Sequence, residues 1–208
     1  MAYTKTLIAK LAMGHLGDRD IADIDDVFDM DAQTLATRYE HARDWVYVQH
    51  DWHWARRSAQ LQQSVTPPTV RYDFAYALPN DYTRVSNVSE FENMDPQLDE
   101  YGWDIVGGKL TTNAGYAFID YVSNSWSEAI WPAYFADCVA LKLAEVACLK
   151  ITHNNGLKET LNKQLMQSIL PQARSVDSTA QPSRPRIIAS PWQRARLGRG
   201  SGSNLRRT

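Results

Sequence analysis

Apolar residues recur along this chain at two different spacings, which separate helical segments from one strand-rich segment. Spacings of three and four residues predict four helices, at about 3–16, 31–54, 128–152 and 156–175. Alternation of apolar and polar residues, interrupted by turn residues, predicts strands within about 59–125. The expected order is therefore two helices, a strand-rich segment and two more helices.

The stretch from Ile130 to Ile151 is the most apolar part of the chain, with 17 apolar residues among its 22. A helix that is apolar on most sides is usually buried against several neighbours. Its four charged residues argue against a membrane span, because each would cost about 3 kcal/mol at the centre of a bilayer. The N-terminal sequence has no long apolar run and predicts no signal peptide or anchor. We interpret this stretch as the central helix of a body that does not enter a membrane.

The strand-rich segment contains two clear turn signals. Gly107-Gly108 lies between two short alternating runs and predicts a tight hairpin, while the Pro79–Asp81 segment predicts a turn before another strand. Because helices precede and follow this segment, the helix pairs must pack together across it. The predicted fold class is α+β, mainly α: a four-helix bundle with a β-sheet-containing insertion between helices 2 and 3, and an extended C-terminal arm. We expect residues 1–177 to form the body and residues 178–208 the arm.

Charge is distributed very unevenly between these two parts. The net charge is −2, but residues 178–208 contain seven arginines, no lysine and no acid. The first 177 residues then hold all 24 acidic residues against 15 basic ones. Many of the acids lie in the Asp18–Asp31 link and the Glu90–Glu100 loop. Such a division predicts an acidic body whose basic arm binds a partner.

Candidate chemistry is sparse. The chain has no GxSxG, P-loop, HExxH or CxxC pattern. His50 and His53 resemble part of a zinc site without a third ligand, and the Asp18–Asp31 link lacks the glycine of a calcium loop. Cys138 and Cys148, both on the central helix, are too far apart for a disulfide and indicate a reducing compartment. We expect no enzymatic activity, no cofactor and no metal.

The arm has three interpretations: a solubilising tail, a nucleic-acid-binding segment, or a segment that docks on another protein. Arginine interleaved with an aromatic residue fits nucleic acid. Spaced apolar anchors among arginines fit protein docking, because arginine and tryptophan are frequent hot-spot residues at interfaces. We expect docking through residues that are either basic or apolar, namely Arg184, Arg186, Ile187, Ile188, Trp192, Arg194 and Arg196.

Several segments, in order, resemble the tail tubular protein A-like head-to-tail adaptors of short-tailed bacteriophages. The first is His50-Asp51-Trp52-His53-Trp54-Ala55-Arg56-Arg57, in which Asp51 stands where the family often has proline. The others are Tyr76-Ala77-Leu78-Pro79-Asn80-Asp81-Tyr82, Gly107-Gly108-Lys109-Leu110, Tyr121-Val122, Trp131-Pro132-Ala133-Tyr134-Phe135, Lys150-Ile151-Thr152 and Pro191-Trp192-Gln193-Arg194-Ala195-Arg196. The resemblance covers most of residues 1–200.

The resemblance implies a structural protein of the virion. Adaptors of this family form a twelve-subunit ring under the portal protein, extend the DNA channel and receive the tail nozzle or tubular protein. Double-stranded DNA would pass without specific binding, and the C-terminal arm, Arg184 to Arg196 here, would reach along the portal. The expected location is the head–tail junction, after assembly in the host cytoplasm. The alternatives are a nucleic-acid-binding protein that uses the arm and, less favoured, a virion-associated peptidoglycan hydrolase.

Overall fold

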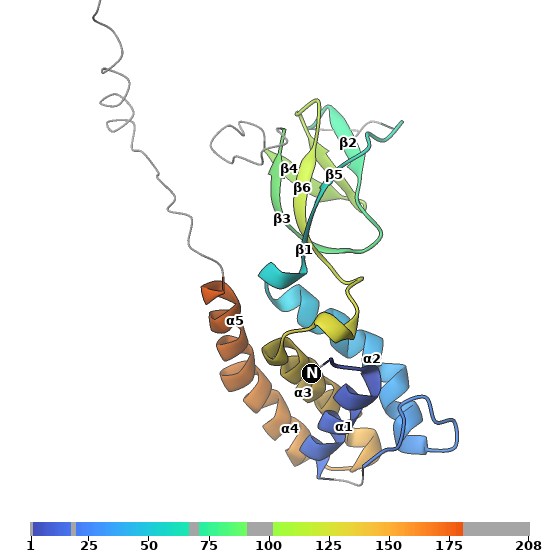
Figure 1. Cartoon of the computed structure of the whole chain (residues 1–208). Helices are drawn as coiled ribbons and strands as arrows, with labels where there is room; N and C mark the ends of the chain where they lie inside the picture. The colour runs from blue at the N-terminus through green and yellow to red at the C-terminus, as the bar shows by residue number, and fades with distance from the viewer. Residues whose placement is uncertain (1, 18–19, 67–70, 91–101, 181–208) are drawn as a thin grey trace, which may run out of the picture.

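The chain folds as a mixed α+β protein, with a helical part and a strand-rich part. The structure is a computed structural model that describes residues 2–17, 20–66, 71–90 and 102–180. The helical part contains α1 (Lys5–Leu16), α2 (Met30–Gln49), α3 (Ala133–Ile151), α4 (Asn155–Gln164) and α5 (Leu170–Thr179). All the strands lie between α2 and α3 in sequence, and in space they form a separate layer beyond one end of the helices (Figure 1).

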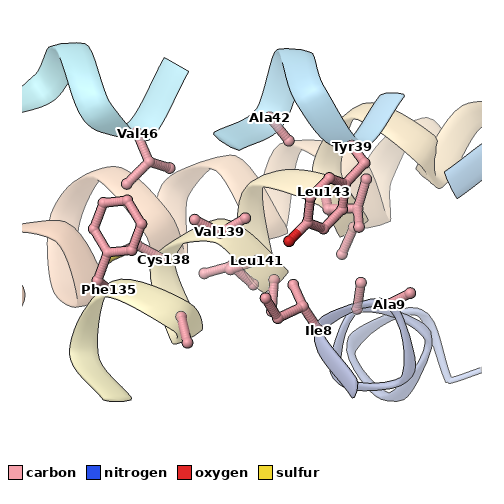
Figure 2. Close-up of a cluster of buried hydrophobic side chains, with 14 of the residues drawn as sticks. Ile8, Ala9, Tyr39, Ala42, Val46, Phe135, Cys138, Val139, Leu141 and Leu143 are labelled. Atoms are coloured by element: carbon pink, nitrogen blue, oxygen red, sulfur yellow. The ribbon is translucent and has the colours of Figure 1, made fainter. Parts of the chain in front are cut away.

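Helix α3 is the centre of the helical part, as its apolar sequence predicts. It contacts α1, α2, α4 and α5, and Val139 and Leu143 are completely buried. Figure 2 shows its side chains between α1, which contributes Ile8, and α2, which contributes Tyr39 and Val46. Burial of this apolar surface is the main force that holds the helices together.

An aromatic cluster closes the end of the helical part that faces the strands. Phe135 of α3 is its centre, with ring centroids 4.8 Å from Tyr47, 4.8 Å from Trp54 and 4.9 Å from Trp131. Tilted and edge-to-face pairs of this kind are favourable for aromatic rings. Several of the chain's tryptophans are therefore used inside the body.

The strands form two small antiparallel sheets. In chain order they are β1 (Arg56–Gln60), β2 (Phe74–Ala77), β3 (Tyr82–Ser89), β4 (Trp103–Val106), β5 (Lys109–Thr112) and β6 (Phe118–Ser123). One sheet has the order β1-β6-β3 and the other β2-β5-β4. A second apolar core, which includes Tyr76, Leu110 and Ile119, lies among the strands.

Two predicted turns are confirmed in this part of the chain. Gly107 and Gly108 connect β4 to β5 with φ angles of 60° and 74°, a conformation that glycine adopts without strain. The Tyr82 N–H donates to the Pro79 carbonyl at 3.2 Å, which closes the turn before β3. In both places the turn residues that the sequence indicates occupy the turn.

The second helix ends earlier than its sequence pattern predicts. We expected it to run from residue 31 to 54, but α2 ends at Gln49, and a short 3₁₀ turn, η1 (His53–Ala55), leads into β1. The buried Trp52 indole donates from Nε1 to the Val46 carbonyl at 2.9 Å, near the end of the helix. The helix begins at Met30, where the Asp29 carboxylate accepts from the Asp31 and Ala32 N–H groups as the cap.

The last helix continues past Pro171, beyond the predicted end at residue 175. Between α4 and α5 lies a π-helical segment, η3 (Leu165–Ile169), where the Leu170 N–H bonds to the Leu165 carbonyl five residues back. Pro171 has no N–H, so a regular helix would lack a hydrogen bond here. The wider π turn accommodates the proline at the start of α5, and the helix extends to Thr179.

The third helix is shorter than the predicted 128–152. A 3₁₀ turn, η2 (Glu128–Ile130), precedes it, and α3 itself starts at Ala133.

Two charged residues of α3 are buried together, with Lys142 Nζ 2.5 Å from Glu145 Oε2 and 4.2 Å from the centroid of the Trp45 ring. Within the described residues, no helix has both the length and the apolar character needed to cross a membrane.

Candidate partner-docking site

The predicted docking residues of the arm lie outside the described part of the chain. These are Arg184, Arg186, Ile187, Ile188, Trp192, Arg194 and Arg196, and their role stays a prediction. The structure does describe the base of the arm, because α5 ends at Thr179. The end of α5 therefore fixes the point at which the arm leaves the body.

The end of α5 is fastened to the body through a buried carboxylate, Asp177, whose side chain is 1% exposed. Its Oδ2 accepts from the His53 backbone N–H at 2.9 Å and lies 3.0 Å from His53 Nδ1, while its Oδ1 accepts from the Tyr134 hydroxyl at 2.9 Å. His50 Nε2 lies 3.3 Å from Oδ2 but does not form a hydrogen bond with it. We call Asp177, His50, His53 and Tyr134 the Asp177 cluster.

Arg174, one turn before Asp177, makes a second connection to the same place. Its Nη2 donates to the Gln49 carbonyl at 2.7 Å. Gln49 is the last residue of α2, which has no basic residue of its own in its last turn. Arg174 therefore supplies the positive charge that stabilises a helix C-terminus.

Burial shifts the pKa values of two members of this cluster, His50 and Tyr134. It lowers the pKa of His50, and the Arg174 guanidinium acts in the same direction, while Asp177 opposes both. Burial also raises the pKa of Tyr134, and its hydrogen bond to Asp177 adds to the rise. His50 is therefore neutral at pH 7, and Tyr134 remains a hydrogen-bond donor.

In the sequence, His50 and His53 were candidates for a different kind of site. Their spacing gave them the appearance of part of a zinc site, whereas in the structure both rings face Asp177, more than a hundred residues later. In the described ranges, no group of three or more histidine, cysteine or acidic residues is arranged to hold a metal ion. No short-range signal pointed to Asp177, since it sits in an ordinary amphipathic helix.

The described part of the acidic link has some apolar residues that pack into the body and others that are exposed to solvent. Ile21 and Ile24 are buried, and Asp23 accepts from the Thr6 hydroxyl of α1 at 2.7 Å. Val27 and Phe28 are 67% and 94% exposed. The link thus presents acidic and apolar side chains side by side on the surface.

Arg56 and Arg57, which end the first resembling segment, bind within the chain. Arg56 of β1 forms a bidentate pair with Asp51. Arg57 lies 3.2 Å from Asp81 and stacks over Trp126, with its guanidinium carbon 4.3 Å from the ring centroid. Both arginines hold the β1-β6-β3 sheet to the segments around it.

The cysteines show no feature of a nucleophile. Cys138 and Cys148 are free and buried on α3. Burial raises the pKa of Cys138 to about 12, so the reactive thiolate is disfavoured.

Comparison of the chain with protein-family models and with curated proteins gave no match. The resemblance to head-to-tail adaptors consequently depends on the ordered motifs of the sequence. Several of these motifs occupy structurally important places. His53 belongs to the Asp177 cluster, Phe135 centres the aromatic cluster, and Gly107-Gly108 form the β4–β5 turn.

Proposed function

We propose that this protein is a head-to-tail adaptor subunit of a short-tailed bacteriophage. Its body is a four-helix bundle formed by α1, α2, α3 and the continuous α4–α5 helix, with the β strands as an insertion. About twelve copies form a ring that extends the DNA channel below the portal. The ring provides the attachment site for the tail nozzle, and DNA passes through it without specific binding.

The observation that carries this proposal is the separation of charge together with the fastening of α5. All seven arginines of residues 178–208 follow a helix end that Asp177 and Arg174 bind to the body. A basic, anchored extension is suited to reaching a neighbouring protein from a fixed starting point. An acidic body is suited to a channel that must not retain DNA, because like charges repel.

The ring also requires two different contact surfaces on each subunit. The helical part exposes Val27 and Phe28 beside the acidic link, and the strand-rich part exposes Ile105 and Val106 on β4. In Figure 1 the α1–α2 connection and the strands lie at opposite ends of the molecule. Two separate apolar surfaces support the proposal of a ring subunit.

The test is docking on portal rings, with and without the arm. The full chain and a chain that ends at Ala180 are mixed with portal rings of the same virus, and complexes are counted by negative-stain imaging and mass measurement. We expect the shortened chain to keep its circular dichroism spectrum and melting temperature but not to dock. Equal docking of the two forms would show that the arm is not the portal-binding element.

Two further variants separate charge from apolar contact within the arm. Trp192→Ala removes the largest anchor, while Arg199→Ala removes a charge that lies beyond the resembling segment. We expect the first to weaken docking by at least about tenfold, as for a hot-spot residue, and the second to have little effect. Equal losses would favour non-specific attraction by the arm.

A nucleic-acid-binding function is the second candidate, and the seven arginines of the arm favour it. Binding to duplex DNA is measured for the full chain at several salt concentrations. A DNA-binding protein would show high affinity that falls steeply as salt rises, because each phosphate contact releases counterions. We expect weak binding at about 150 mM salt, as an adaptor requires.

A further inference from the structure

The short segment between α2 and β1 is bound by two separate sets of partners, one on α5 and one on the β1-β6-β3 sheet. We call residues 49–53 the α2–β1 turn. On one side Asp177 of α5 binds the His53 N–H and ring, and Arg174 binds the Gln49 carbonyl. On the other side the Asp51 carboxylate accepts from Arg56 of β1 and from Ser86 of β3. One turn therefore touches both the base of the arm and the β1-β6-β3 sheet.

This turn has little freedom to absorb a movement. Trp52, at its centre, is completely buried, donates to the Val46 carbonyl and lies with its ring centroid 5.2 Å from that of Phe135. Closely packed side chains transmit displacements rather than absorb them. A shift on one side of the turn must either be passed to the other side or break buried hydrogen bonds.

Breaking these bonds is unfavourable on both sides. Asp177 is 1% exposed, so loss of its donors would leave a buried carboxylate without partners. Asp51 is half-buried, and burial alone would raise the pKa of its carboxyl group. The hydrogen bonds from Arg56 and Ser86 outweigh burial and lower this pKa, so these partners favour the ionised form. Each carboxylate thus holds its own side of the turn firmly.

We propose that the α2–β1 turn couples the base of the arm to the β1-β6-β3 sheet. A partner that engages the arm and shifts the last turn of α5 changes the stability of β1 and β3, and a partner on the sheet changes how firmly α5 is held. The two effects are equal in free energy, because coupling between two sites is reciprocal. The coupling itself is a property of the isolated chain, whereas its use by a partner on the arm rests on the proposed function.

The test is hydrogen–deuterium exchange of the full chain in four forms: unchanged, Asp177→Asn, Ser86→Ala and the double variant. We expect Asp177→Asn to speed exchange in β1 and β3 as well as in α5, and Ser86→Ala to speed exchange at residues 173–179. Exchange in α1, on the other side of α3, should not change. If each substitution affects only its own side of the turn, the proposal is wrong.

The double variant gives the size of the coupling. We expect its effect on exchange to differ by about fivefold from the product of the two single effects, as for sites that share one network. Strictly multiplicative effects would overturn the proposal. Asp25→Asn, which removes an exposed carboxylate on the acidic link, serves as the matched control and should change neither segment.

A second pair of variants keeps the test decisive if Asp177→Asn does not fold. His53→Asn retains a donor near the position of Nδ1, whereas His53→Ala removes it. We expect His53→Ala to speed exchange in both α5 and β3, and His53→Asn to restore most of the protection in both. Restoration in α5 without restoration in β3 would show that His53 only stabilises the helix end.

Discussion

At the scale of single residues, the Asp177 cluster should make stability depend on pH. His50 faces Asp177 and Arg174 of α5, while Asp51 and His53 lie on its own segment. Burial lowers its pKa in the folded state below the value of about 6.5 in an unfolded chain. Between these two pKa values His50 binds more protons in the unfolded state, so its contribution to the free energy of unfolding falls as pH falls.

The corresponding prediction compares unchanged protein with His50→Gln. We expect the free energy of unfolding to decrease between pH 7.5 and pH 5.5, and to decrease less in the variant, which has no proton to gain. Urea denaturation at each pH measures both. His41→Gln, at an exposed position on α2, is the matched control and should follow the unchanged protein. Identical slopes for all three would mean that His50 contributes nothing to the pH dependence.

At the scale of elements, the central helix depends on a few fully buried rings. Phe135 is completely buried and contacts four other aromatic rings, while Phe28 is 94% exposed. We expect Phe135→Ala to lower the free energy of unfolding by about 3–5 kcal/mol, through lost burial and a cavity. Phe28→Ala, the same chemical change, should alter it by less than about 0.5 kcal/mol.

Chemical denaturation of the two phenylalanine variants measures this difference. The slope with denaturant should be the same for both, because the surface exposed on unfolding hardly changes. A loss below about 1 kcal/mol at Phe135 would show that the aromatic cluster can collapse around the missing ring. A large loss at Phe28 would show that the acidic link is part of the folded core.

The elements that the sequence predicted best are those that depend on local pattern. The apolar run of α3 and the Gly107-Gly108 hairpin follow from residues within a few positions of one another. The end of α2 does not, because it depends on the burial of Trp52 and on contacts with Arg174, more than a hundred residues away. The passage of the last helix through Pro171 depends on a π turn, which no apolar spacing indicates.

At the scale of the whole molecule, the order of helices and strands could be predicted, but the place where distant segments meet could not. His50 and His53 were considered together for a zinc site, and only the packing of α5 against α3 and η1 gives them Asp177 as a partner. The docking arm, by contrast, was predicted from composition and spacing, and it stays a prediction. Charge and apolar content can be counted from the sequence, whereas the partners of a buried side chain are known only once the fold is known.

The charge of the whole molecule leads to the last prediction, which concerns the acidic link. If acidic side chains of the Asp18–Asp31 link or the Glu90–Glu100 loop line the ring, reversing two exposed ones should make the channel hold DNA. Asp20 and Asp25 are both exposed, and Asp20→Lys/Asp25→Lys changes the net charge from −2 to about +2. We expect assembled rings of this variant to retain linear duplex DNA at about 50 mM salt and to release it as salt rises.

A second double variant separates the position of the charge from its amount. Asp104→Lys/Glu159→Lys makes the same change of net charge on β4 and α4, where both side chains are exposed. We expect rings of this variant to release DNA as the unchanged protein does, because local potential rather than total charge governs contact with DNA in a channel. Equal retention by both double variants would show that the link has no special position. Release by both would show that the acidic link does not line the channel.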